Sequence, residues 1–175
     1  DRVLAAPRGR ARQMNAGAAQ ACGDILLFLH ADTLVPAGFA GAVTAACAAP
    51  GIVGGRFDVR LEPSSPLIHL TGELINRRSR LTHVSTGDQA IFIRREAFEQ
   101  LGGYADIPLM EDIDLSKRMK RVGTIACLRQ RVTTSARRWQ KNGVVRTILL
   151  MWSLRALYFF GVSPARLQRV YAHTR

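Results

Sequence analysis

The chain has no acidic residue after Asp114, and this absence is the strongest feature of its composition. Residues 115–175 hold 14 basic residues, whereas residues 1–114 hold 11 basic and 13 acidic residues. The net charge of +12 for the 175 residues therefore comes entirely from the stretch after Asp114. Such an excess favours an anionic partner, which could be nucleic acid, a membrane surface or a phosphorylated substrate. Composition alone does not choose among them.

Cysteine, lysine and aromatic residues are also scarce. The three cysteines stand far apart without a Cys-x-x-Cys pair, which argues against a disulfide framework or zinc site and indicates reduced thiols in the cytoplasm. Only 3 of the 25 basic residues are lysine, aromatic residues make up 7%, and no RNA-recognition or zinc-finger pattern occurs. No basic segment leads into an apolar run as in a signal peptide. The length and the hydrophobic fraction of 47% indicate one globular domain.

Apolar runs alternate with helical patterns along most of the chain. Strands are predicted at 3–5, 24–30, 52–61, 90–93 and 124–128, and helices at 10–22, 36–49, 67–80, 96–101 and 111–121. This alternation predicts an α/β fold with a mainly parallel sheet flanked by helices. We expect one α/β domain over residues 1–143 and a C-terminal apolar helix with a basic tail over residues 144–175.

The apolar run at 144–162 is long enough to suggest a membrane span, but it contains Arg146 and Arg155. Each arginine near the centre of a span costs about 2.5–3.5 kcal/mol on insertion scales, which disfavours a simple crossing. The two arginines lie nine positions apart and so point to opposite sides of a helix. The run is expected to pack on the domain, on a second copy in a homodimer, or on an anionic membrane surface.

Two acidic segments are candidates for chemistry. His30 and Asp32 follow a buried strand, at the edge of an α/β sheet where ligands bind, and an extended segment would point both side chains the same way. The carboxylate suits a divalent cation that bridges phosphates; the alternative is that Asp32 caps the following turn and His30 forms a local hydrogen bond. Glu111, Asp112 and Asp114 begin a helix, where they serve either as caps or as a general base.

Two basic segments give weaker signals. Residues 9–13 precede a helix whose first amides could hold a phosphate, and Arg12 could add charge-assisted hydrogen bonds. A second basic segment comprises Arg77, Arg78, Arg80 and His83. It is predicted to be a solvent-exposed face.

Taken in order, five segments resemble the family 2 glycosyltransferases with a GT-A fold, and the likeness is closest to the bacterial radical-SAM/selenodomain-associated subgroup. The segments are Gly-Arg-Ala-Arg-Gln-Met-Asn-Ala-Gly at 9–17, Gly-Asp-Ile-Leu-Leu-Phe-Leu-His-Ala-Asp-Thr at 23–33, Gly-Asp-Gln-Ala-Ile-Phe-Ile-Arg-Arg-Glu-Ala-Phe at 87–98, Leu-Gly-Gly-Tyr at 101–104 and Glu-Asp-Ile-Asp-Leu at 111–115. The resemblance runs from about residue 8 to residue 139. It implies a Rossmann-like nucleotide-diphospho-sugar transferase fold and a catalytic role for residues 1–143.

The resemblance also implies roles for individual residues. Asp32 matches the last acid of the family's Asp-x-Asp, which holds Mg²⁺ or Mn²⁺ against the donor diphosphate, and Asp112 matches the base that deprotonates the acceptor hydroxyl in inverting transfer. The remaining positions divide between the donor and the acceptor or sugar side: Arg12, Asn15 and His30 with the donor, and Gly87, Asp88, Gln89, Glu111, Arg138 and Trp139 with the acceptor or sugar.

The sequence departs from the family pattern at three places. His30 replaces the first acid of Asp-x-Asp, and Ser135 replaces the glutamine of the Gln-x-x-Arg-Trp found in processive members, which predicts a non-processive enzyme. The family's opening strand and acidic nucleoside-binding residues normally precede the Gly9 segment, whereas only eight residues do so here. The resemblance therefore implies one of two things: the given sequence is truncated, or the protein has lost part of its donor pocket. In either case the sheet of this sequence is expected to lack its first strand or strands.

The resemblance thus implies a metal-dependent glycosyltransferase that moves a sugar from a nucleotide-diphosphate donor to a hydroxyl acceptor, which could be lipid-linked. It is expected in the cytoplasm, peripheral to the membrane, without a specific nucleic-acid partner. The alternatives are a basic nucleic-acid-binding protein and an inactive GT-A relic apposed to the membrane.

Overall fold

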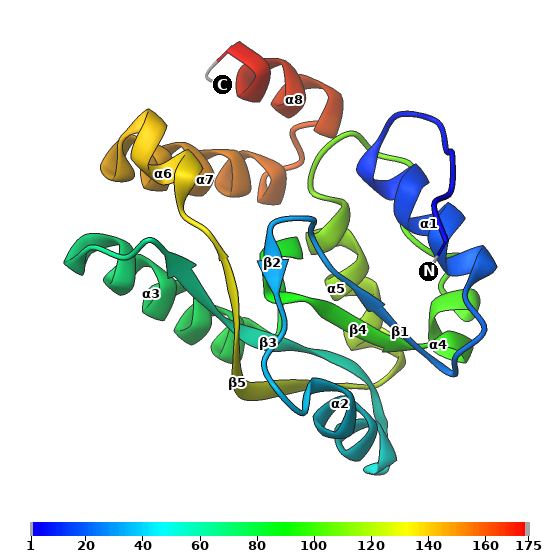
Figure 1. Cartoon of the computed structure of the whole chain (residues 1–175). Coiled ribbons are helices and arrows are strands. Elements are labelled where there is room, and N and C mark those ends of the chain that lie inside the picture. Colours follow the sequence, from blue (N-terminus) through cyan, green and yellow to red (C-terminus); the bar gives the residue numbers. More distant parts are fainter. Residues whose placement is uncertain (1, 174–175) are drawn as a thin grey trace.

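The computed structural model describes residues 2–173 and forms an α/β fold around one curled sheet (Figure 1). Its five strands are β1 (Ile25–Phe28), β2 (Thr33–Leu34), β3 (Ile52–Glu62), β4 (Ile91–Arg94) and β5 (Thr124–Ser135), and they lie in the order β1-β4-β3-β5-β2. The centre of the sheet is the long parallel ladder of β3 and β5, which runs from Ile52 opposite Thr124 to Glu62 opposite Ser135.

The sheet is mixed, so the prediction of a mainly parallel sheet is wrong. Strands β1, β3 and β5 share one direction, as alternation with helices implies, but β4 inserts between β1 and β3 and runs antiparallel to both. The short β2 is antiparallel to β5. Alternation of strands and helices indicates that strands joined through a helix run parallel, but it does not show which strands become neighbours in the sheet. The antiparallel insertion of β4 could therefore not be predicted from the sequence pattern.

Helices cover both faces of the sheet. On one face lie α1 (Arg10–Gln20), α4 (Arg95–Gln100) and α5 (Glu111–Val122), and on the other lie α2 (Phe39–Ala48) and α3 (Pro66–Thr82). The pleat divides β4 between the faces, because Ile91 and Ile93 join the first core while Phe92 joins the second. At the centre the strands approach closely: a Cβ on Gly54 would lie 2.3 Å from the Phe92 carbonyl oxygen, so only glycine fits.

Most predicted elements have nearby counterparts, with three differences. Residues 3–5 form no strand, β5 extends to Ser135, and residues 31–32 form a turn rather than an extended segment. That turn is closed by the Thr33 N–H, which donates to the His30 carbonyl at 3.1 Å.

The C-terminal helices α6 (Arg137–Asn142), α7 (Val144–Phe159) and α8 (Pro164–His173) pack on the open end of the sheet (Figure 1). Their contact with the α/β layers is a third core, in which Leu154 of α7 and Leu167 of α8 meet Met110 and Ile113. Among the helices of residues 2–173, none combines the length and apolar character that a membrane crossing requires.

Buried polar contacts fix α3 against the sheet. Both the N–H and the carbonyl of Val59 are bonded by the Asn76 side chain, at 2.8 and 3.0 Å. Asp58 accepts from the fully buried Arg56 and from Arg80, at 2.6 Å for the latter. The helix therefore stands as a fixed wall beside the carboxyl end of β3.

Candidate active site

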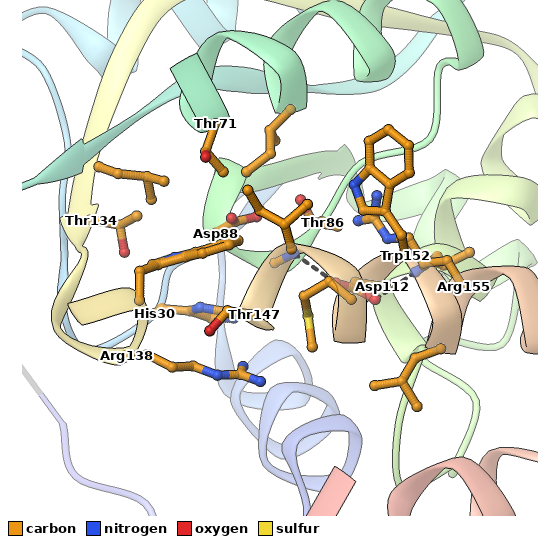
Figure 2. Close-up of a pocket in the computed structure, with 18 of the residues that line it drawn as sticks. His30, Thr71, Thr86, Asp88, Asp112, Thr134, Arg138, Thr147, Trp152 and Arg155 are labelled. Carbon is orange, nitrogen blue, oxygen red and sulfur yellow. Dashed lines mark hydrogen bonds between the residues drawn. The ribbon is translucent and has the colours of Figure 1, made fainter. Parts of the chain in front are cut away.

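A cavity of about 390 Å³ opens at the carboxyl ends of the parallel strands β1, β3 and β5. Its floor includes residues after β1 and at the ends of β3 and β5, and its walls are α3, α5, α6 and α7. This is the edge at which open α/β sheets bind ligands, because loops and helix termini converge there. Figure 2 shows Asp88, Asp112, Arg138 and Arg155 reaching the cavity from four different elements.

Asp112 is the most firmly held acid of the cavity. It lies in the first turn of α5 and is 9% exposed. Its Oδ2 accepts the Gly87 N–H at 2.8 Å, and its Oδ1 accepts the Ile113 N–H at 2.8 Å. A carboxylate has about four acceptor positions, so each oxygen can accept one more hydrogen bond after these two are made. The two backbone bonds orient the carboxylate toward the cavity and leave it able to take a proton.

His30 and Asp32 both line the cavity, although the reason predicted for their alignment is wrong. The turn at 31–32, not an extended segment, brings them to the same side. The His30 ring packs directly on Gly87, where a Cβ would lie 2.4 Å from Nε2. Asp32 is exposed at the rim. His30, Gly87 and Asp112 thus form a continuous wall from the end of β1 to the start of α5.

The 3₁₀ turn η1 (Gly87–Gln89) presents Asp88 to the cavity. Its shape is fixed by the fully buried Gln89, whose Oε1 accepts the Thr86 N–H at 3.2 Å and whose Nε2 donates to the Phe57 carbonyl at 3.5 Å. Within residues 2–173, the buried Oδ1 of Asp88 has no hydrogen-bond donor. The turn therefore holds an acceptor that a ligand could satisfy.

Three arginines also line the cavity, Arg78 from α3, Arg138 from α6 and Arg155 from α7. None of them forms an ion pair within the described residues. Burial lowers the pKa of Arg78 to about 10, helped by the nearby charge of Arg155, and burial also lowers the pKa of Arg155. The charges of Asp88 and Asp112 oppose both shifts, although neither carboxylate forms an ion pair with these arginines in the described structure.

Arg10 also reaches the cavity but is already paired. It bonds Glu111 at 2.5 Å, and the Glu111 side chain is only 3% exposed. Burial and the neighbouring Asp112 raise the pKa of Glu111, while Arg10 opposes the shift. Glu111 lies behind the main cavity, beside His30 and Gly87, where it joins α1 to α5. This position suits a support for Asp112 rather than direct contact with a sugar.

The structure brings together His30, Asp32, Gly87, Asp88, Asp112, Arg138 and Trp139 and leaves the other predicted site residues elsewhere. Arg12 makes a bidentate pair with Asp106 on the surface, at 2.8–3.0 Å. Asn15 clamps the backbone of Tyr104, donating to its carbonyl at 2.8 Å and accepting its N–H at 2.9 Å. Both residues therefore act as links between α1 and the segment before α5.

Arg78 and Arg155 are site residues that the sequence did not reveal. Arg78 belongs to the basic segment predicted to face solvent, and the helical spacing alone does not show that its neighbour Arg77 is exposed while Arg78 enters the cavity. For Arg155, the sequence gives one indication: its spacing of nine residues from Arg146 predicts that the two side chains point to opposite sides of the helix. Arg146 is exposed and Arg155 lines the cavity.

A divalent cation would find one predicted ligand here. Within residues 2–173, no three His, Cys, Asp or Glu side chains gather as a metal cluster. Magnesium in nucleotide-dependent sites is commonly held by one or two carboxylates together with substrate phosphates and waters. The exposed carboxylate of Asp32 fits that mode, in which the cation arrives with the phosphates.

No protein-family model matches the chain, and no curated protein matches it.

Proposed function

We propose that the chain is a GT-A-type glycosyltransferase that moves a sugar from a nucleotide-diphosphate donor to a hydroxyl acceptor, with inversion and one transfer per encounter. The observation that carries the proposal is the convergence of Asp32, Asp88 and Asp112 on one cavity at the carboxyl edge of the sheet. These acids come from three segments that are far apart in the chain, and each segment belongs to the family resemblance.

In the proposed reaction, Asp112 is the catalytic base. The acceptor hydroxyl gives its proton to a carboxylate oxygen of Asp112 as it attacks the anomeric carbon, and the bond from that carbon to the donor diphosphate breaks. The hydrogen bonds from Gly87 and Ile113 keep the carboxylate in position before the acceptor arrives, which saves the cost of orienting it during the reaction.

The donor diphosphate is proposed to lie near Asp32, with His30 between it and the Gly87 turn. Mg²⁺ or Mn²⁺ held by Asp32 and the phosphates would neutralise charge on the diphosphate. The Oδ1 of Asp88 has no hydrogen-bond partner in the described structure, so it is suited to accept a hydrogen bond from a hydroxyl group of the sugar or the acceptor.

The test is calorimetric titration of a form of the protein with a complete N-terminus, using a panel of nucleoside-diphosphate sugars in the presence and absence of Mn²⁺. We expect Mn²⁺-dependent binding that Asp32→Ala abolishes. Asp112→Asn should keep donor binding and abolish sugar transfer and donor turnover, because the amide cannot take the proton. The matched control is Asp24→Ala, which removes an exposed carboxylate just before β1, at the opposite end of the strand that Asp32 follows.

The proposal is overturned if that form of the protein binds no nucleoside-diphosphate sugar, with or without metal. It is also overturned if Asp24→Ala and Asp32→Ala weaken binding equally, since the effect would then reflect net charge rather than the cavity.

A further inference from the structure

The cavity wall on α3 has a half-buried arginine, two of whose buried nitrogens have no hydrogen-bond partner in the described structure. Both Nε and Nη2 of Arg78 are buried without a hydrogen-bond acceptor among residues 2–173, and Nε of Arg138 is in the same state. Leaving such a charged donor buried and unsatisfied costs several times more than a neutral hydrogen bond gains. An unoccupied guanidinium of this kind indicates a ligand that accepts hydrogen bonds and carries negative charge.

The acids and the arginines of the cavity come from different elements. Asp32, Asp88 and Asp112 come from the turn after β1, from η1 and from α5, whereas the arginines come from α3, α6 and α7. Although opposite charges line one cavity, no ion pair joins the two groups in the described chain. The arginine wall is thus free to bind an anion of its own, apart from the phosphates proposed to lie near Asp32.

Two rows of exposed apolar side chains flank the mouth of the cavity beside these arginines. On α3 they are Leu67, Leu70 and Leu74, and on α7 they are Val145, Leu149 and Trp152, all between 41% and 64% exposed. Each row follows helical spacing, so it forms a stripe along one face of its helix. Leu74 and Trp152 line the cavity as well, and α3 and α7 contact each other, so the stripes meet at its opening.

The surface around these stripes is basic. Arg77 of α3, Arg137 and Lys141 of α6 and Arg146 of α7 are exposed, and no acidic residue occurs on α6, α7 or α8. A soluble phosphorylated ligand would need the arginines of the cavity but not the exposed apolar rows. The combination fits a molecule with a phosphate at one end and hydrocarbon at the other, lying in an anionic lipid surface.

We infer that the acceptor is a phosphate-bearing amphiphile whose phosphate binds Arg78, Arg138 and Arg155 while its apolar chain leaves the cavity between Leu74 and Trp152. The identification of this molecule as the sugar acceptor rests on the proposed function. In that reaction the phosphate anchors the molecule, and a hydroxyl of the same head group receives the sugar beside Asp112. The binding itself depends only on the arginine wall and the apolar rows.

The test measures binding to phosphatidylcholine vesicles that contain either phosphatidic acid or phosphatidylglycerol, adjusted to equal surface charge. Phosphatidic acid presents a phosphate monoester that can enter the cavity, whereas the phosphate of phosphatidylglycerol is blocked by its second ester. In a Trp139→Phe background, Trp152 is the sole tryptophan and reports insertion at the mouth through a blue shift of its emission. We expect tighter binding and a larger shift with phosphatidic acid.

Arg78→Gln and Arg77→Gln form a matched pair, because they remove the same charge from adjacent positions inside and outside the cavity. Arg78→Gln should weaken binding to phosphatidic acid about ten- to a hundredfold, the value of charge-assisted hydrogen bonds to a buried group. Arg77→Gln should weaken binding to both vesicles about fivefold, the value of one basic residue near an anionic surface. Equal effects of the two variants on both vesicles would overturn the inference.

Two further arms separate the sources of the phosphate and protect the test against misfolding. Inorganic phosphate should bind far more weakly than phosphatidic acid, and Leu70→Ser with Leu74→Ser should weaken vesicle binding without changing phosphate binding. If inorganic phosphate binds as well as the lipid and the serine variants have no effect, the ligand is soluble and the inference is wrong. The serine variants change exposed positions, so they remain informative even if Arg78→Gln does not fold.

Donor titrations distinguish this inference from the proposed function. Arg78→Gln should bind nucleoside-diphosphate sugars as the parent chain does. If the variant loses donor binding, Arg78 belongs to the donor site and the inference is overturned while the proposed function stands. If the form with a complete N-terminus binds phosphatidic acid but no donor, the lipid site stands and the proposed function fails.

Discussion

Two arginine–carboxylate pairs on the same strand provide a direct test of how burial controls the strength of an ion pair. Arg56 with Asp58 and Arg60 with Glu62 have the same spacing on β3. The first pair is buried, with side chains 0% and 9% exposed, whereas the second is 54% and 42% exposed. We predict that Asp58→Asn strongly destabilises the chain and that Glu62→Gln hardly affects it.

The magnitude follows from what each substitution leaves behind. Asp58→Asn leaves the guanidinium of Arg56 buried without its counter-charge, and Nε of Arg56 already has no partner in the described structure. Removing one partner of a buried pair costs about 3–5 kcal/mol. Arg80 also loses a contact, but it is partly exposed and keeps its bond to the Cys127 carbonyl at 2.9 Å. An exposed pair is worth only about 0–1 kcal/mol, because water replaces it.

Urea denaturation followed by circular dichroism measures both effects on the free energy of unfolding. With an m value of about 2 kcal/mol/M, Asp58→Asn should lower the urea midpoint by about 1.5–2.5 M and Glu62→Gln by about 0.5 M or less. The double variant Arg56→Met with Asp58→Leu should recover most of the loss, because it removes both buried charges together. Equal midpoints for the two single variants would refute the claim that the buried cluster anchors α3.

Two further predictions concern the site. Gly87→Ala should lower the free energy of unfolding by only about 1 kcal/mol, because the new methyl group meets the movable end of the His30 ring. In a double-mutant cycle, adding His30→Ala should restore this loss of stability. A loss of several kcal/mol that His30→Ala leaves unchanged would contradict this packing. Because burial and Asp112 raise the pKa of Glu111 in the folded state, its contribution to stability is present below the ordinary glutamate pKa of about 4.3 and is lost as the pH rises through the raised value. The stability of the parent chain relative to Glu111→Gln should therefore fall between acidic and neutral pH in urea titrations, and a difference that grows with pH would contradict the shift.

The sequence predicts local elements well where one pattern dominates. The run from Ile25 to Phe28 is a strand, and the spacing of Leu115 and Met119 on α5 places both side chains in the core, as expected from periodicity. The neighbours of a strand depend on tertiary packing, so the insertion of β4 beside β1 was out of reach of these patterns.

The same distinction applies to the site. Asp32 and Asp112 could be predicted as cavity residues, because each follows or begins an element at the ligand-binding edge of the sheet. Arg12 could not be excluded, since its partner Asp106 lies 94 residues away in the sequence. Arg78 was missed because a helix in isolation does not reveal which of two adjacent arginines another helix will cover.

The arginines of the fold differ from those of the cavity in their hydrogen-bond partners, and the absence of acids after Asp114 contributes to this difference. Arginines that link parts of the fold donate hydrogen bonds to a carboxylate or a backbone carbonyl. Arg56 and Arg80 both pair with Asp58. Arg118 pairs with Asp114 at 2.7 Å, and Arg95 donates to the Gly23 carbonyl at 2.9 Å.

Within residues 2–173, the buried Nε and Nη2 of Arg78 and Nε of Arg138 have no such acceptor, and neither α6 nor α7 carries an acid that could supply one. A glutamate on the inner face of either helix would pair with a cavity guanidinium and relieve its unsatisfied charge, at the expense of any anion that would otherwise bind there. Introducing that carboxylate, as in Ile148→Glu at the cavity wall, should therefore abolish binding to phosphatidic acid vesicles while leaving the exposed basic surface unchanged. Unaltered binding in that variant would mean that the unpaired arginines do not hold the phosphate, whatever their burial.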